Sequence, residues 1–271
     1  MMDRRTTPYS GEVAHVALKG QVAAARFTEG EPAQVGIPLV DLLAHPEGPR
    51  DRQLLLGERF LVIDRREGHA FGRAERDGYC GWLPEAALAA PETATHHVAV
   101  PASHLYPEPR VQAHEIGALS FGARLTVIGE ARNFFETTVG WVPARHLWPV
   151  DRLHSDPVAV ARLFHGTPYL WGGNSRAGID CSGLAQAALL ACGIECPRDS
   201  DLQQAVGSEV TGELQAGDLL FWKGHVAMAI DARRMIHATG YVMGVIEEEI
   251  EAAIARITAA GEGPVLARRR P

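Results

Sequence analysis

The chain has 271 residues, of which 46% are hydrophobic and 22% charged, and its formal net charge is −7. This length exceeds one average domain of ~100–200 residues, and the composition excludes a disordered or fibrous protein. Its arginines are scattered rather than clustered, so we expect no nucleic-acid partner.

The N-terminal segment MMDRRTTPYSGEV carries positive charges without an apolar run behind them. No stretch of the chain reaches the ~18 apolar residues of a membrane span. We therefore expect a cytoplasmic protein with no membrane partner, although a leader upstream of Met1 would change that expectation. The four cysteines, at positions 80, 181, 192 and 196, lack the spacing of a zinc site and are too few for a disulfide scaffold. We expect no metal and no cofactor.

An internal repeat occupies the first half of the chain. LLLGERFLVI at Leu54–Ile63 matches ALSFGARLTVI at Ala118–Ile128, and GWLP at residues 81–84 matches GWVP at residues 140–143. Each copy alternates short apolar strands with turn residues, which is typical of a small all-β barrel.

The repeats resemble bacterial SH3 domains, so we expect one barrel with an N-terminal extension in residues 1–90 and a second in residues 91–150. Trp82 and Trp141 are expected to be core residues. The first barrel has an added loop rich in Pro and Gly, around residues 45–52, and such loops often carry function. The second barrel has no polar cluster, which favours a role as spacer.

The pattern changes after Pro149. Residues 157–164 have the apolar period of a helix, and a second helix is predicted after the segment GTPYLWGGNSRAGIDCSG, with Gly193 as its end. Cys181 should therefore lie at or just before this helix N-terminus. A free thiol has a pKa near ~8.5, and the positive end of a helix favours the thiolate, so we expect a reactive cysteine.

Two histidines could serve this cysteine. His225 begins an apolar strand, and His237 follows on the next strand after a turn predicted at residues 231–234. Whether the two imidazoles share a face depends on a strand register that the sequence leaves open, because a slip of one residue would separate them. A cysteine with a base and a group that orients the base is the arrangement of nucleophilic catalysis.

Three short motifs, DCSG at 180–183, GHV at 224–226 and IHA at 236–238, resemble the NlpC family of papain-like cysteine peptidases. The resemblance implies an α+β peptidase domain in residues 151–271, with helices packed on an antiparallel sheet. It further implies that Cys181 is the nucleophile, His225 the base and His237 the residue that orients it. Tyr169 matches the tyrosine of the family's oxyanion site.

Two SH3-like barrels before an NlpC domain resemble the γ-D-glutamyl-L-diamino-acid endopeptidases, which recycle murein peptides that have a free N-terminal L-Ala. This implies a murein tripeptide or tetrapeptide as substrate. The diamino acid, diaminopimelate or lysine, stays open, as does the oligomeric state. The resemblance implies these substrate-binding residues: Asp180, Ser182, Asp199, Ser200, Glu58 and Tyr79.

Two other functions are possible for the same domains. An exported hydrolase or amidase would act on the intact wall through a more open cleft. A non-catalytic peptidoglycan-binding protein would have a degenerate third domain, but the intact Cys181, His225 and His237 argue against it. The terminal arginines at 268–270 are expected to form a solvated tail.

Overall fold

The computed structural model describes residues 2–271 and divides into two compact units, one up to Asp151 and one from Arg152 to Pro271. A division of the first unit near residue 90 stays a prediction. Within residues 2–271, no helix combines the length and apolar character needed to cross a membrane.

The first repeat is built on a seven-stranded antiparallel sheet with the order β5-β4-β8-β7-β6-β3-β9. Its core contains fully buried Val35, Leu42, Leu54, Phe60 and Leu83. The strands are β3 (Glu31–Val35), β4 (Leu39–Leu43), β5 (Arg50–Leu55), β6 (Arg59–Arg66), β7 (His69–Ala74), β8 (Cys80–Pro84) and β9 (Leu88–Ala89).

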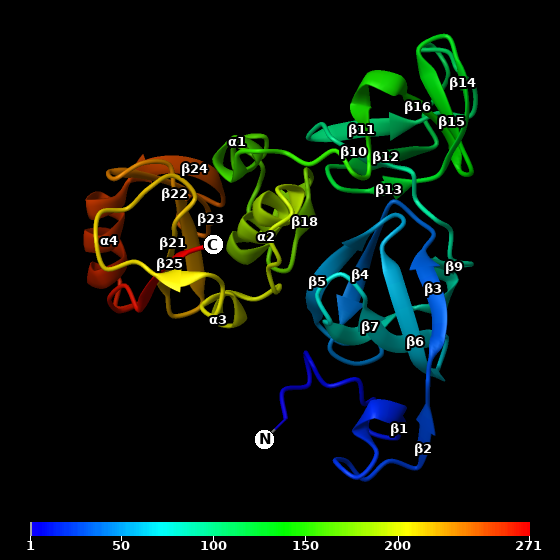
Figure 1. Cartoon of the computed structure of the whole chain (residues 1–271), viewed down its shortest axis with the longest axis horizontal. Coiled ribbons are helices and arrows are strands. Elements are labelled where there is room, and N and C mark those ends of the chain that lie inside the picture. Colours follow the sequence, from blue (N-terminus) through cyan, green and yellow to red (C-terminus); the bar gives the residue numbers. More distant parts are fainter. Residues whose placement is uncertain (1) are drawn as a thin grey trace. The chain divides into compact units, whose positions relative to one another are not determined.

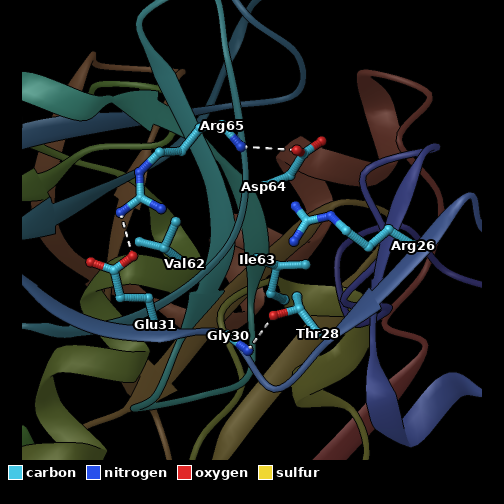
Figure 2. Close-up of a pocket in the computed structure, with 8 residues that line it drawn as sticks. All are labelled: Arg26, Thr28, Gly30, Glu31, Val62, Ile63, Asp64 and Arg65. Carbon is cyan, nitrogen blue, oxygen red and sulfur yellow. Dashed lines mark hydrogen bonds and ion pairs between the residues drawn. The ribbon is translucent and has the colours of Figure 1, made fainter.

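The N-terminal extension forms a small parallel pair, β1 (Val13–His15) with β2 (Arg26–Thr28), joined through the 3₁₀ helix η1 (Val16–Leu18). A half-open groove of about 300 Å³ lies between this extension and β6. The groove is polar, and its wall includes the Arg65–Glu31 ion pair (Figure 2). None of the candidate site residues lines it.

The second repeat forms three small antiparallel sheets around one core. Leu55 and Leu56 from the first repeat pack into that core with Val98, Leu119 and Val142, so the two repeats share apolar contacts. The elements are β10 (His96–Val98), β11 (Ala102–Leu105), β12 (Gly117–Ser120), β13 (Arg124–Leu125), β14 (Val127–Ala131), β15 (Phe134–Thr137), β16 (Gly140–Pro143), η3 (Ala144–His146) and β17 (Leu147–Pro149).

The sequence repeat has a structural counterpart. In the first copy β8 ends at a proline, followed by the 3₁₀ helix η2 (Glu85–Ala87) and β9. In the second copy β16, η3 and β17 follow the same order. Trp82 is buried, as predicted, but Trp141 is only half-buried, so the prediction that both are core residues was wrong for Trp141. It pairs with the strand-like Tyr106 at a sheet edge, where one face stays accessible.

The second unit contains a six-stranded antiparallel sheet with the order β20-β25-β21-β22-β23-β24. Helices α2 and α4 flank this sheet (Figure 1). The strands are β18 (Asn174–Ser175), β19 (Gly178–Ile179), β20 (Ser208–Glu209), β21 (Leu219–Trp222), β22 (His225–Ala229), β23 (Arg234–Thr239), β24 (Gly244–Glu249) and β25 (Ala267–Arg270). The helices are α1 (Pro157–Arg162), α2 (Cys181–Ala191), α3 (Ser200–Gln203) and α4 (Ile250–Ala259).

The C-terminal arginines do not form a solvated tail, so that expectation was wrong. They belong to β25, which pairs with β20 and β21. The Arg270 guanidinium donates two hydrogen bonds of 2.7 Å to the buried Asp218 carboxylate. Backbone pairing and this ion pair supply the interactions that hold the segment on the sheet.

Candidate active site

Cys181 is the first residue of α2, as the sequence predicted. Asp180 is the N-cap, because its carboxylate accepts the Gly183 N–H at 2.7 Å. The Cys181 Sγ lies 4.0 Å from the Gly224 carbonyl oxygen, and the Val226 backbone N–H donates toward the sulfur. The nucleophile candidate therefore lies against the backbone on both sides of His225.

The electrostatics of Cys181 differ from the sequence expectation. Burial, followed by the Asp180 charge, raises the pKa of the Cys181 thiol to about 12. The backbone N–H groups and Arg198 act in the opposite direction without outweighing burial. The helix N-terminus is present, but it does not make a resting thiolate here.

The two histidines meet. Strand β22 pairs with β23 through Met228 opposite Ile236 and Ala229 opposite Met235. Continued by one residue, this register puts Ala227 opposite His237. His225 lies two residues before Ala227, so His225 and His237 are diagonal neighbours on one face. His225 Nε2 and His237 Nδ1 are 2.8 Å apart. The pair that the sequence left dependent on register is thus formed.

The surroundings of His225 favour its neutral form. Burial, followed by electrostatic interaction with His237 and Arg256, lowers the pKa of His225 to about 3, while Glu248 acts in the opposite direction. A neutral imidazole is a base that can take a thiol proton during attack.

Tyr169 lies close to the nucleophile. Its backbone N–H bonds the Met243 carbonyl at 2.9 Å, and the residue bridges to Ile179, just before Asp180. Burial raises the pKa of the Tyr169 phenol, and the charges of Cys181 and Asp180 raise it further, so the phenol stays protonated and can donate. Its role at the oxyanion site stays a prediction that this placement supports.

Asp180 and Ser182 are held by a buried arginine that the sequence reasoning missed. Arg198 donates to the Ser182 Oγ at 2.6 Å and to the Asp180 carboxylate at 2.9 Å. Asp180 also accepts the Gly172 N–H at 2.8 Å. These contacts give both side chains a role inside the protein, and their contact with substrate stays a prediction. The signal for Arg198 in the sequence was its place between Pro197 and Asp199.

Asp199 and Ser200 lie together at the start of α3. Asp199 is the half-buried N-cap residue without a capping side-chain hydrogen bond, and Ser200 is buried. Gln203 ties this turn to the nucleophile helix by donating to the Ser182 and Pro197 carbonyl oxygens, both at 2.9 Å. Both residues are therefore anchored near Ser182, and their substrate contacts stay predictions.

Glu58 and Tyr79 belong to the first unit, where both are buried. The Glu58 Oε1 accepts the Leu55 N–H at 3.1 Å and pairs with Arg76 at 3.2 Å. Tyr79 belongs to the core, with the Arg52 guanidinium 5.5 Å from its ring centroid. These contacts are structural, and the substrate contacts of the two residues stay predictions.

Sequence reasoning also missed Glu248. Its Oε1 lies 2.7 Å from His237 Nε2 and also contacts Arg256 of α4. Within residues 2–271, no group of His, Cys, Asp and Glu side chains is arranged to hold a metal ion. The site therefore consists of a thiol, two linked imidazoles, a phenol and the carboxylates around them.

Comparison with known proteins agrees with this arrangement. Residues 166–257 match the NlpC/P60 family, and residues 42–88 match the bacterial dipeptidyl-peptidase Sh3 domain. The second repeat lies outside these matches, and its assignment as an SH3 domain stays a prediction. The structure is similar to a crystal structure of an NlpC/P60 family protein from Bacillus cereus, with a TM-score of 0.76. The match covers 89% of this chain and 99% of the Bacillus cereus chain. At 23% identity, that likeness shows the fold alone.

Curated relatives extend the similarity along most of the chain. A gamma-D-glutamyl-L-lysine dipeptidyl-peptidase from Bacillus cereus is 31% identical over 69% of this chain and 67% of the relative. A protein of the same name from Bacillus subtilis is also 31% identical, over 69% of this chain and 71% of its own length. With the geometry of Cys181, His225 and His237, these matches show that the chain belongs to the NlpC/P60 family of cysteine peptidases.

Proposed function

We propose that this peptidase hydrolyses the bond between γ-D-Glu and the diamino acid of murein peptides that carry a free N-terminal L-Ala. The observation that carries the proposal is the combination, in one chain, of a dipeptidyl-peptidase type SH3 domain with the NlpC/P60 domain. Two relatives, each aligned over 69% of the chain, are named gamma-D-glutamyl-L-lysine dipeptidyl-peptidase.

The proposed reaction begins at the thiol. Burial favours the neutral form of both the thiol and the imidazole before the attack. As Cys181 Sγ bonds to the γ-carbonyl carbon, its proton passes to the His225 imidazole. The carbonyl oxygen becomes an oxyanion, for which the Tyr169 hydroxyl and the Cys181 backbone N–H are the proposed donors. Such a donor contributes about 2.7–4 kcal/mol to the transition state.

Collapse of this intermediate breaks the C–N bond. His225 gives its proton to the leaving nitrogen, the diamino acid departs and a thioester remains on Cys181. Water then attacks the thioester, His225 takes a water proton, and the sulfur leaves and is reprotonated. Acid–base catalysis of this kind contributes ~10²–10⁴ in rate.

Recognition of the free amine is assigned to carboxylates. Asp199, at the start of α3, is proposed to bind the substrate ammonium, with Ser200 beside it. A charge-assisted hydrogen bond contributes about 1.5–3 kcal/mol, so an acetylated peptide should bind poorly. Asp180 and Ser182 are proposed to line the same subsite while Arg198 holds them.

Such a specificity suits recycling of released wall peptides, and we propose that the enzyme works in the cytoplasm. The four cysteines are free thiols, which suits a reducing compartment. Cell fractionation followed by immunoblotting tests this location: a signal in the cytosol is expected, and a signal confined to the wall or culture medium would favour the exported hydrolase.

The decisive experiment is mass spectrometry of digests of L-Ala-γ-D-Glu-meso-diaminopimelate and its L-Lys counterpart, each with and without an N-acetyl group. Wild-type protein should release the free diamino acid from the unblocked peptides, and Cys181→Ala should release none. Equal cleavage of blocked peptides would indicate a wall hydrolase. No cleavage of any peptide would contradict the proposal and leave a peptidoglycan-binding role.

A further inference from the structure

Three polar side chains form a diagonal row across three neighbouring strands. His225 lies on β22, His237 on β23 and Glu248 on β24. In the β23–β24 pair, Met235 is opposite Glu248 and His237 is opposite Ile246, so Glu248 and His237 project from the same face and are diagonal neighbours. The strand pairing thus extends the histidine pair by one carboxylate.

With both imidazoles neutral, the hydrogen-bond chemistry of this row has one consistent assignment. An ionised carboxylate only accepts, so the 2.7 Å contact with Glu248 requires the proton of His237 to be on Nε2. In neutral His237 the Nδ1 is then an acceptor, and the 2.8 Å contact requires His225 to donate from its own Nε2. The remaining nitrogen of His225, Nδ1, carries the lone pair.

We propose that Glu248 is a positioning residue that sets the tautomers of both histidines, so that His225 presents an unprotonated Nδ1 to the Cys181 thiol. Without this carboxylate, His237 can carry its proton on Nδ1 and would then face His225 Nε2–H with a second donor. This inference rests on the cysteine-peptidase chemistry of the site and not on the choice of murein substrate.

Glu248 is also held in place by Arg256, which contacts the same carboxylate oxygen as His237. The Arg256 guanidinium of α4 contacts Glu248 Oε1, and its Cζ lies 4.1 Å from the centroid of the Tyr241 ring. Burial opposes ionisation, but the hydrogen bond from His237 and the charge of Arg256 lower the pKa of Glu248, so the carboxylate is charged at neutral pH. The acceptor that the tautomers require is therefore present.

The preceding residue provides a matched control. Glu247 is opposite Ile236 and projects from the other face, where it pairs with Arg162 at 2.8 Å and Arg234 at 2.7 Å. Its side chain is 17% exposed, against 19% for Glu248. Replacing either glutamate by glutamine removes the same charge from the same strand, but only Glu248 bonds to His237.

The first test compares Glu248→Gln with Glu247→Gln in steady-state kinetics on the cleaved peptide. We expect kcat of Glu248→Gln to fall at least about tenfold with KM unchanged, because a wrong tautomer weakens general-base catalysis worth ~10²–10⁴ in rate. Glu247→Gln should keep the wild-type kcat, and Glu248→Asp, which retains the carboxylate, should recover part of the loss. An equal loss in both Gln variants, or none in Glu248→Gln, would overturn the proposal.

The second test needs no substrate. Imidazole ¹⁵N NMR of the full chain with labelled histidine reports which ring nitrogen carries each proton. Wild type should show His237 protonated on Nε2, and Glu248→Gln should show a population protonated on Nδ1. A wild-type His237 protonated on Nδ1 alone would overturn the proposal even if every variant failed to fold. If no murein peptide is cleaved, the spectrum still decides, so the two proposals can fail separately.

Discussion

Cys80 in the first unit and Cys181 in the second are both buried thiols, with similar electrostatics but different neighbours. Burial raises the pKa of Cys80 in the first unit and of Cys181 in the second to about 12. Cys80 Sγ faces the Gly78 carbonyl oxygen at 3.5 Å, whereas Cys181 Sγ faces that of Gly224 at 4.0 Å, next to His225. A shifted thiol pKa therefore does not identify a nucleophile, and an adjacent base does.

The units also bury one arginine–aspartate pair each. Arg52 and Asp77 are fully buried in the first unit, and Arg198 binds Asp180 in the second. Asp180 additionally caps α2 and adjoins the nucleophile. The same kind of pair thus supports a β-sheet core in one unit and positions a reactive group in the other.

The largest expected effect separates the two thiols. Cys181→Ala should lower kcat/KM at least ~10³-fold, because the attacking atom is lost. Cys80→Ala should leave kcat/KM within about twofold of wild type, since the charges that act on this thiol come from Arg73 and Asp77 and not from a histidine. The measurement is diaminopimelate release under identical conditions, with folding checked by circular dichroism. Substantial activity in Cys181→Ala would contradict the comparison.

Breaking the two buried ion pairs should have similar energetic but different catalytic effects. Arg198→Met and Arg52→Met each remove the arginine that pairs with a buried aspartate carboxylate. Each substitution should lower the free energy of unfolding by about 3–5 kcal/mol. Only Arg198→Met should also lower kcat, because Arg198 counteracts the Asp180 charge that raises the pKa of Cys181.

Hydrogen exchange measured for separate segments of the chain can show in which unit each variant loses stability. The remaining activity is then measured below the unfolding temperature, per mole of folded protein. Equal losses of kcat in the two variants would show that Arg198 acts only through stability.

Local signals in the sequence predicted the position of the nucleophile. Asp180 as cap, the apolar spacing that follows and Gly193 after the helix are all short-range features, and α2 begins at Cys181 as expected. The strand–turn–strand around residues 231–234 was equally local. These features depend on neighbours within a few residues, so one sequence suffices to find them.

Features that depend on pairing or burial could not be predicted. Residues 247–249 are three consecutive glutamates, and only the β23–β24 register shows that Glu248 shares the face of His237. The raised pKa of Cys181 depends on groups brought together by the fold, because burial outweighs the helix N-terminus. β25 similarly needs its partner strands to become a strand at all.

A smaller effect tests how tightly the nucleophile helix packs. A Cβ on Gly183 would lie 2.8 Å from the Gly173 carbonyl oxygen and 2.9 Å from the Asp180 carboxylate, so the backbone must shift. Gly183→Ala should therefore cost about 1–3 kcal/mol despite the better helix propensity of alanine. Gly212→Ala is the control, because a Cβ there meets nothing within 4 Å. Thermal unfolding gives the Tm of both variants. An unchanged Tm for Gly183→Ala would show that α2 can shift to accommodate the added Cβ without loss of stability.

The smallest expected effect is the change in stability at acidic pH caused by the Asp218–Arg270 ion pair of the C-terminal strand. Burial raises the pKa of Asp218, but the hydrogen bonds from Arg270 and from the Gln215 N–H outweigh it, so the folded pKa lies below the usual value of an aspartate, 3.8. A depressed carboxyl pKa stabilises the folded state above the unfolded pKa, and this contribution is lost as the pH falls through the folded pKa. Asp218→Asn should therefore cost about 1 kcal/mol at pH 7 and progressively less below pH ~4.

A double-mutant cycle separates this pair from its surroundings. Arg270→Gln should cost a similar amount at pH 7, and the double variant should lose little beyond either single variant, because both substitutions remove one interaction. Urea unfolding at pH 7 and pH 3 gives the four free energies at each pH. Additive losses would mean that backbone pairing of β25 with β21, and not the ion pair, holds the C-terminal strand on the sheet.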